Sequence, residues 1–190
     1  MSYQVTIGLS NKHLHLSEED LTALFGKDQK LVPFKDLVQP GQFASEQKVD
    51  IVGPKGTLKG IRILGPTRPE TQVELSLTDA RTIGIDIPVR ESGKLDGTPG
   101  VKLVGPAGEV ELKRGVIAAL RHVHLSPAQA KEAGVKDKQI VKIKVGGERG
   151  VIFENVLVRS GDGHEAEIHF DTDEGNAAGL KSGDIGEIIA

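Results

Sequence analysis

Six histidines and no cysteine set the chemistry open to this 190-residue chain. Four of the histidines form two pairs of equal spacing, His13 with His15 and His122 with His124. Side chains at positions i and i+2 of a strand point to the same face. Each pair can therefore present two imidazoles to one divalent cation, although a single pair on a strand is more often plain polar surface.

A fifth histidine, His169, ends another predicted strand and is followed by the acid-rich segment 171–174. Five histidines without sulfur ligands suit zinc or another first-row metal and fit calcium or magnesium poorly. They exceed one tetrahedral site with an open position, so two metals with three or fewer protein ligands each are the economical interpretation. The spacing leaves open which carboxylate completes the set. His164, in the turn that begins at residue 160, is expected to be ordinary loop surface.

Arg68 is a candidate for binding an anion. It follows a Gly-Pro turn and precedes a predicted strand with Gln72 and Glu74 on one face. A planar guanidinium suits bidentate contact with phosphate. Other arginines lie at or near predicted strand ends: Arg62, Arg90, Arg121 and Arg159. For any single arginine, Arg68 included, a surface carboxylate partner is the simpler interpretation.

Composition excludes several classes of protein. The net charge of −3 gives no basic field for nucleic acid or an anionic membrane. No apolar stretch approaches the length of about 20 residues that spans a bilayer, and the first residues lack the features of a signal peptide. Zero cysteine excludes disulfides and thiolate chemistry. The sequence also lacks the G-x-S-x-G elbow, the P-loop, the dinucleotide-binding glycine motif and H-E-x-x-H.

Short runs of Val, Ile and Leu between Gly and Pro predict strands joined by tight turns, with few long helices. The turns Gly53–Gly56 and Gly105–Gly108 share the pattern G-P-x-G and are typical of hairpins. The predicted strands are 49–52, 57–64, 71–77, 101–104, 109–113, 140–145, 150–158 and 165–170.

An internal repeat accompanies the histidine pairs. His13-Leu-His-Leu-Ser17 returns as His122-Val-His-Leu-Ser126, and each serine is a natural N-cap for a short helix that a glycine ends, Gly26 or Gly134. The predicted helices are 18–25, 127–133, a short capped one within 78–84, and one that follows Thr172 and ends at Gly179. The chain is therefore predicted to be mainly β. We expect two β-barrel domains from an internal duplication, capped by short α-helices, with residues 1–26 and about 116–190 in one and about 27–115 in the other.

Five motifs together resemble the PduL-type phosphate acyltransferases, in family order over nearly the whole chain. They are S-N-K-H-L-H-L-S from Ser10, G-P-x-R-x-x-T-Q-V-E from Gly65, V-R-x-S-G from Val89, R-H-V-H-L from Arg121, and H-F-D-T-D-E-x-N-A from His169. The departures are mild: Lys12 replaces a common Arg, Leu14 a β-branched residue and Gly175 an Ala. None removes a histidine.

The resemblance implies two β-barrel domains with a dinuclear zinc site between them. It also implies reversible transfer of an acyl group, propanoyl or acetyl, between coenzyme A and inorganic phosphate, without an acyl-enzyme. The metal ligands it implies are His13, His15 and Glu74 for one Zn²⁺ and His122, His124 and His169 for the other. Of these, Glu74 comes from the resemblance alone.

The resemblance assigns further residues to the substrates. Arg68 would be the catalytic residue. Arg68, Gln72, Ser92 and Arg159 would bind phosphate or acyl phosphate. Ser10, Lys35, Arg62 and Asn176 would bind CoA or acyl-CoA.

Two alternatives stay open at this point. A His-liganded metal β-barrel of the oxygenase or sensor type would bind iron without acyl transfer, and a duplicated scaffold would bind no metal. Family members packaged in microcompartments tend to carry an extension before the first H-x-H motif, which here begins at His13. We therefore expect a free cytoplasmic enzyme of acetate, propanoate or propanediol metabolism, without nucleic-acid or membrane partners. Association with a microcompartment, self-association as a homo-oligomer and the choice between acetyl and propanoyl are left open.

Overall fold

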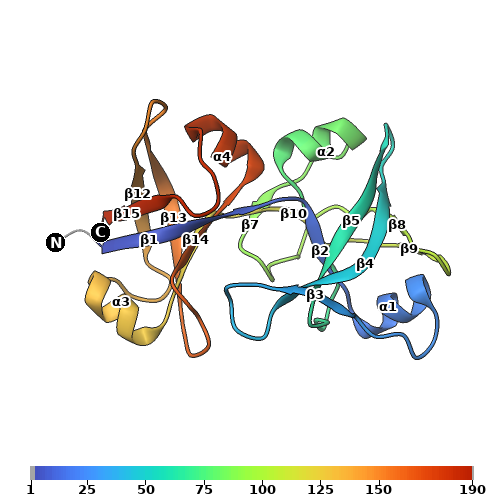
Figure 1. The fold of residues 1–190 in the computed structure, drawn as a ribbon. Coiled ribbons are helices and arrows are strands. Elements are labelled where there is room, and N and C mark those ends of the chain that lie inside the picture. The colour runs from blue at the N-terminus through green and yellow to red at the C-terminus, as the bar shows by residue number, and fades with distance from the viewer. Residues whose placement is uncertain (1–2, 190) are drawn as a thin grey trace. The chain divides into compact units, whose positions relative to one another are not determined.

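The computed structural model describes residues 3–189 as a mainly β chain, which confirms the predicted fold class (Figure 1). The described residues form two compact units. Unit 1 consists of residues 3–11, 38–40 and 120–189, and unit 2 of residues 12–37 and 41–119. This division places residues 12–26 with unit 2, whereas the sequence pattern predicts residues 1–26 in one domain with the C-terminal part of the chain.

Unit 1 is a closed barrel of six strands in the order β1-β14-β11-β13-β12-β15. Side chains alternate along its strands: in β12 every second residue is buried, and Ile143 is fully covered. Two helices, α3 and α4, belong to this unit. The bounds are β1 Tyr3–Ser10, β11 His122–Leu125, α3 Pro127–Ala133, β12 Ile140–Val145, β13 Val151–Ser160, β14 Glu167–Asp171, α4 Thr172–Ala178 and β15 Ile185–Ile189.

Unit 2 is a nine-stranded sheet in the order β7-β10-β6-β2-β5-β4-β8-β9, with β3 paired to β4. It forms a curled half-barrel and not a second closed barrel, because within the described residues its end strands β7 and β9 do not pair with each other. The bounds are β2 His13–His15, α1 Glu18–Phe25, β3 Pro33–Asp36, β4 Phe43–Val52, β5 Thr57–Gly65, β6 Gln72–Glu74, α2 Leu77–Ile83, β7 Val89–Arg90, β8 Lys102–Val104, β9 Glu109–Glu111 and β10 Val116–Ala119.

The strand–serine–helix–glycine repeat is confirmed in both units. Ser17 Oγ accepts a hydrogen bond from the Asp20 amide at the start of α1, and Ser126 caps α3 in the same way with a full capping box. The same design occurs twice more, with Ser76 before α2 and Asp171 before α4. The predicted strand 71–77 is too long at its end, because β6 ends at Glu74 and Ser76 caps α2, which begins at Leu77.

The two G-P-x-G turns are hairpin turns, and each also covers the C-terminal end of a helix. The amide of Lys55 in the β4–β5 turn donates to the Ile83 carbonyl of α2 at 3.0 Å, and the amide of Ala107 in the β8–β9 turn donates to the Leu24 carbonyl of α1 at 3.0 Å. Carbonyls at a helix end need such donors from outside the helix. The repeated turn therefore fixes α1 and α2 to the sheet.

Gly105 tests this arrangement because its backbone approaches α1 closely. A Cβ atom at Gly105 would lie 2.4 Å from the Leu24 carbonyl oxygen and 2.9 Å from Leu24 Cβ. We expect Gly105→Ala to lower the free energy of unfolding by about 1–3 kcal/mol, as overpacking does. Urea unfolding measures the change. Gly146→Ala is the matched control, since nothing lies within 4 Å of its Cβ position, and an equal loss in both variants would contradict the prediction.

Candidate functional site

In unit 2, strand pairing places two histidines and a carboxylate together. Strands β2 and β6 run antiparallel with His13 opposite Glu74 and His15 opposite Gln72. Glu74 Oε2 lies 3.5 Å from His13 Nε2, and Glu74 Oε1 lies 4.0 Å from His15 Nε2. One ligand atom from each of the three residues lies within 4.8 Å of the others. This set, His13 with His15 and Glu74, can hold one metal ion.

The buried histidine of this set is uncharged at neutral pH. Burial, reinforced by the charges of His13 and Arg68, lowers the pKa of His15 to about 3. Its side chain is 3% exposed. A neutral imidazole is the form that ligates metals, so His15 is in the protonation state that a cation needs.

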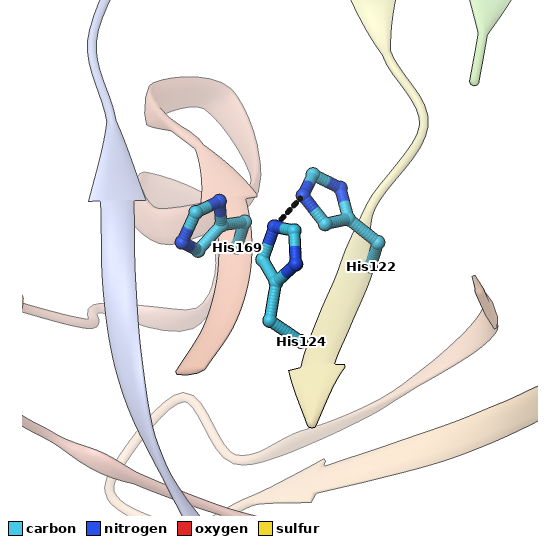
Figure 2. Close-up of side chains that lie close together, drawn as sticks. All are labelled: His122, His124 and His169. Carbon is cyan, nitrogen blue, oxygen red and sulfur yellow. Dashed lines mark hydrogen bonds between the residues drawn. The ribbon is translucent and has the colours of Figure 1, made fainter. Parts of the chain in front are cut away.

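In unit 1, the equivalent pairing gathers three histidines (Figure 2). Strands β11 and β14 run antiparallel with His122 opposite His169 and His124 opposite Glu167. The three imidazole centroids lie 4.7–4.9 Å apart, and the rings of His122 and His124 are buried. Burial and then the charges of His122 and His169 lower the pKa of His124. The three rings form a second set that can hold a metal ion.

The geometry of the unit 1 set suits a tetrahedral metal. His122 Nε2 and His124 Nε2 lie 3.1 Å apart, joined by the hydrogen bond drawn in Figure 2. Nitrogen ligands about 2.0–2.1 Å from a tetrahedral zinc are about 3.3 Å from each other. The backbone carbonyl of Leu120 accepts from His122 Nδ1 at 2.9 Å, an outer contact that typically fixes the tautomer of a metal-binding histidine.

Two residues next to this set were missed by the sequence analysis. Glu167 Oε2 lies 2.6 Å from His169 Nε2. His164, expected to be ordinary loop surface, instead places its Nδ1 2.5 Å from Nδ1 of His124, so that expectation was wrong. The spacing i, i+2 between Glu167 and His169 was a signal for the first. His164 and His124 are 40 residues apart in the sequence, so no local pattern predicts their contact.

The predicted phosphate-binding residues of unit 2 lie together. Gln72 Nε2 donates to Ser92 Oγ at 2.8 Å and to Glu74 Oε1 at 2.5 Å, and its own Oε1 accepts from the Gly93 amide at 2.7 Å. Arg68 Nη1 donates to Ser92 Oγ at 3.3 Å. The carboxamide of Gln72 thus links the candidate anion site to the carboxylate of the candidate metal site.

Arg159, the fourth predicted phosphate ligand, belongs to unit 1. It lies opposite His124 in the β11–β13 pairing, and its charge contributes to the lowered pKa of His124. Arg121 has a carboxylate partner, as the simpler interpretation expected: its Nε lies 2.7 Å from Glu174 Oε1. Despite that partner, burial raises the pKa of Glu174 to about 7.

The four predicted CoA-binding residues are divided evenly between the units. In unit 1, Ser10 ends β1, where it lies opposite Asp171 of β14, and Asn176 lies in α4. In unit 2, Lys35 lies in β3. Arg62 of β5 donates to the Ser45 carbonyl at 2.5 Å, and its guanidinium lies 4.6 Å from the ring centroid of Phe34.

Comparison with known proteins matches nearly the whole chain. The family model described as phosphate propanoyltransferase matches residues 6–181. The chain belongs to the phosphate propanoyltransferase family. It is 51% identical to a phosphate propanoyltransferase of Thermotoga maritima over 97% of this chain and 89% of that protein. It is 52% identical to one of Sebaldella termitidis (94% and 85% covered) and 45% identical to one of Clostridioides difficile (97% and 88% covered).

Membership of the phosphate propanoyltransferase family confirms the resemblance drawn from the five motifs and makes the protein an acyltransferase. The non-catalytic scaffold loses its support with this result. The described residues contain no helix long and apolar enough to cross a membrane.

The lowered histidine pKa values predict how the metal-free protein responds to acid. His15 has a pKa of about 3 in the folded state and an ordinary value of 6.5, so below about pH 6.5 the unfolded chain binds a proton that the folded protein does not. The contribution of uncharged His15 to the free energy of unfolding is therefore complete above about pH 6.5. It is lost as the pH falls below that value, by at most about 1.4 kcal/mol per pH unit.

Urea unfolding of metal-free protein at about pH 7.5 and pH 5 measures the loss. We expect His15→Gln to lose less stability between the two pH values than the wild type, since the variant lacks the group. Equal losses would contradict the prediction.

Proposed function

We propose that this acyltransferase moves a short acyl group, propanoyl or acetyl, reversibly between coenzyme A and inorganic phosphate with the help of two zinc ions. The observation that carries the proposal is the pair of three-residue ligand sets in a member of the phosphate propanoyltransferase family, one of them linked through Gln72 to Arg68 and Ser92. The relatives named above are phosphate propanoyltransferases by name, which supports the transfer of a propanoyl group to or from phosphate.

The ligand chemistry supports zinc. Nitrogen and carboxylate donors without sulfur suit a first-row metal, and three protein ligands leave a position open for a substrate. His13, His15 and Glu74 would hold one ion, and His122, His124 and His169 the other. Bound there, zinc supplies a Lewis acid that stabilises the CoA thiolate and lowers the pKa of phosphate.

The side chains near Glu74 would bind the attacking phosphate. The guanidinium of Arg68 supplies paired donors for phosphate oxygens, and the hydroxyl of Ser92 lies 3.3 Å from it. Gln72 is fixed by the Gly93 amide, so its amide group keeps one orientation. These groups would orient a phosphate oxygen toward the thioester carbonyl and offset its charge as the new bond forms. Arg159 is proposed as a further phosphate contact.

CoA binding is proposed for residues that offer a cation, a hydroxyl or an amide to its phosphates and pantetheine chain. The proposed residues are Ser10, Lys35, Arg62 and Asn176. No acyl-enzyme is required, because phosphate itself is the nucleophile. A free cytoplasmic location stays a prediction, which cell fractionation tests.

One observation keeps a second candidate function in view. The set of His13, His15 and Glu74 contains two histidines and one carboxylate, the ligands of many non-haem iron oxygenases. The side chains proposed to bind phosphate beside it and the family membership favour acyl transfer. Metal analysis distinguishes the two functions, because an oxygenase would contain redox-active iron.

Activity provides the first test of the proposed function. Purified protein with zinc should release free CoA from propanoyl-CoA or acetyl-CoA only when phosphate is added, and a thiol reagent measures the release. We expect Arg68→Ala to raise the KM for phosphate and to lower kcat/KM by about 10²–10³, the size typical of losing one transition-state donor.

Arg114→Ala is the matched control for this test. Arg114 is an exposed arginine of the same unit, paired with Glu70 and Asp96, and its replacement should leave kcat/KM unchanged. Wild-type protein that releases no phosphate-dependent thiol would refute the proposed activity.

Metal content provides a separate test. We expect about two zinc ions per wild-type chain after dialysis, and about one in His13→Ala/His15→Ala and in His122→Ala/His124→Ala, because each double variant removes two of three ligands from one set. Elemental analysis measures the content. An exposed substitution such as Lys113→Ala should retain both ions, and two ions retained in either histidine variant would refute the assignment.

A further inference from the structure

The ring nitrogen of His124 that does not face His122 contacts the imidazole of another histidine. Its Nδ1 atom lies 2.5 Å from Nδ1 of His164, which belongs to the turn between β13 and β14. The two ring planes are 17° apart and their centroids 4.5 Å apart. At this Nδ1–Nδ1 distance one of the two nitrogens carries the hydrogen and donates, and the other accepts.

One backbone carbonyl sets the direction of the hydrogen bonds in this group. The Leu120 carbonyl can only accept, so the proton of a neutral His122 is on Nδ1 and its Nε2 is an acceptor. His124 must then donate from Nε2 to His122 Nε2, 3.1 Å away, in the hydrogen bond drawn in Figure 2. The Nδ1 of His124 is left as an acceptor, and His164 donates to it from its own Nδ1.

To bind a metal through Nε2, His124 must adopt the opposite tautomer. Nε2 must lose its hydrogen to bind a cation, so the proton of the neutral ring has to move to Nδ1. A carbonyl at that position would fix this tautomer permanently, and in the metal-free protein it would leave two bare Nε2 atoms 3.1 Å apart. An imidazole partner can donate in one state and accept in the other.

We propose that His164 is a positioning residue of His124, which holds the ring in both states by exchanging its role from donor to acceptor. The protons balance. His124 gives its Nε2 proton to solvent and receives the Nδ1 proton of His164, and His164 takes one proton from solvent at its own Nε2. Both rings stay neutral and the hydrogen bond between them is kept. The second state rests on the proposed function, because it requires zinc at the unit 1 set.

Nitrogen-15 NMR of the imidazoles tests the exchange directly, at a fixed pH of about 7.5. In metal-free protein we expect the proton of His124 on Nε2 and that of His164 on Nδ1. With one equivalent of zinc at the unit 1 set, in a His15→Ala background, we expect both assignments to reverse. Metal-free protein in which the proton of His124 is already on Nδ1 would overturn the inference.

Zinc affinity in the same background tests the consequence for binding. Outer contacts of a ligating histidine typically change metal affinity by 10–100-fold. We expect His164→Leu, which has neither donor nor acceptor, to weaken zinc binding by this factor in competition with a chelator. His164→Asn should recover most of the loss, because a carboxamide can rotate to donate or accept.

Asp162→Ala controls for disturbance of the turn, since Asp162 is an exposed residue of the same turn, and it should bind zinc like the parent. Equal affinity of the His164→Leu variant and its parent would refute the positioning role. A parent that binds no zinc would refute the proposed metal chemistry and with it the exchange, whereas the metal-free NMR assignment would still decide the direction of the hydrogen bonds.

Discussion

The register of two antiparallel strand pairs is the constraint on which both candidate metal sites depend. β2 meets β6 with His13 opposite Glu74, and β11 meets β14 with His122 opposite His169. A slip of one residue would turn the ligand side chains to the other face of the sheet. The residues between the ligands prevent such a slip, because Leu14 and Val123 are completely buried and a slip would expose them. The apolar core therefore holds the ligands in register.

The elements that flank each strand pair help to hold its register. A serine follows each H-x-H strand and caps the next helix, so the chain turns away soon after the ligands. In unit 2 the β8–β9 turn then fixes the end of α1 through the Leu24 carbonyl. The helices are short, at seven or eight residues. Isolated helices of that length are unstable in water, so their stability comes from the caps and from packing on the sheet.

Local patterns predicted much of this structure. Spacing alone indicated the histidine pairs, and the serine and glycine caps predicted the helices at 18–25 and 127–133, which the structure confirms. Glu74 required the family resemblance, because nothing local distinguishes its carboxylate from those of its neighbours. His164 was missed because its partner is 40 residues away. The open edge of unit 2 was missed as well, since whether a sheet closes depends on strand pairing between distant segments.

The two ligand sets are related copies that carry their negative charge at different places. The strand opposite the histidine pair reads Gln72-Val73-Glu74 in unit 2 and Glu167-Ile168-His169 in unit 1. Each contains one carboxylate, at the ligand position in unit 2 and two residues earlier in unit 1.

The carboxylate occupies a different position in each strand, but each set keeps one. In unit 2 the carboxylate is itself a ligand and receives a hydrogen bond from the neutral Gln72. In unit 1 the imidazole of His169 takes the ligand position, and the carboxylate of Glu167 contacts it from outside at 2.6 Å. Carboxylates in such outer positions raise the basicity of the histidine they contact. Each unit therefore brings one negative charge to its candidate metal, directly in one copy and through a histidine in the other.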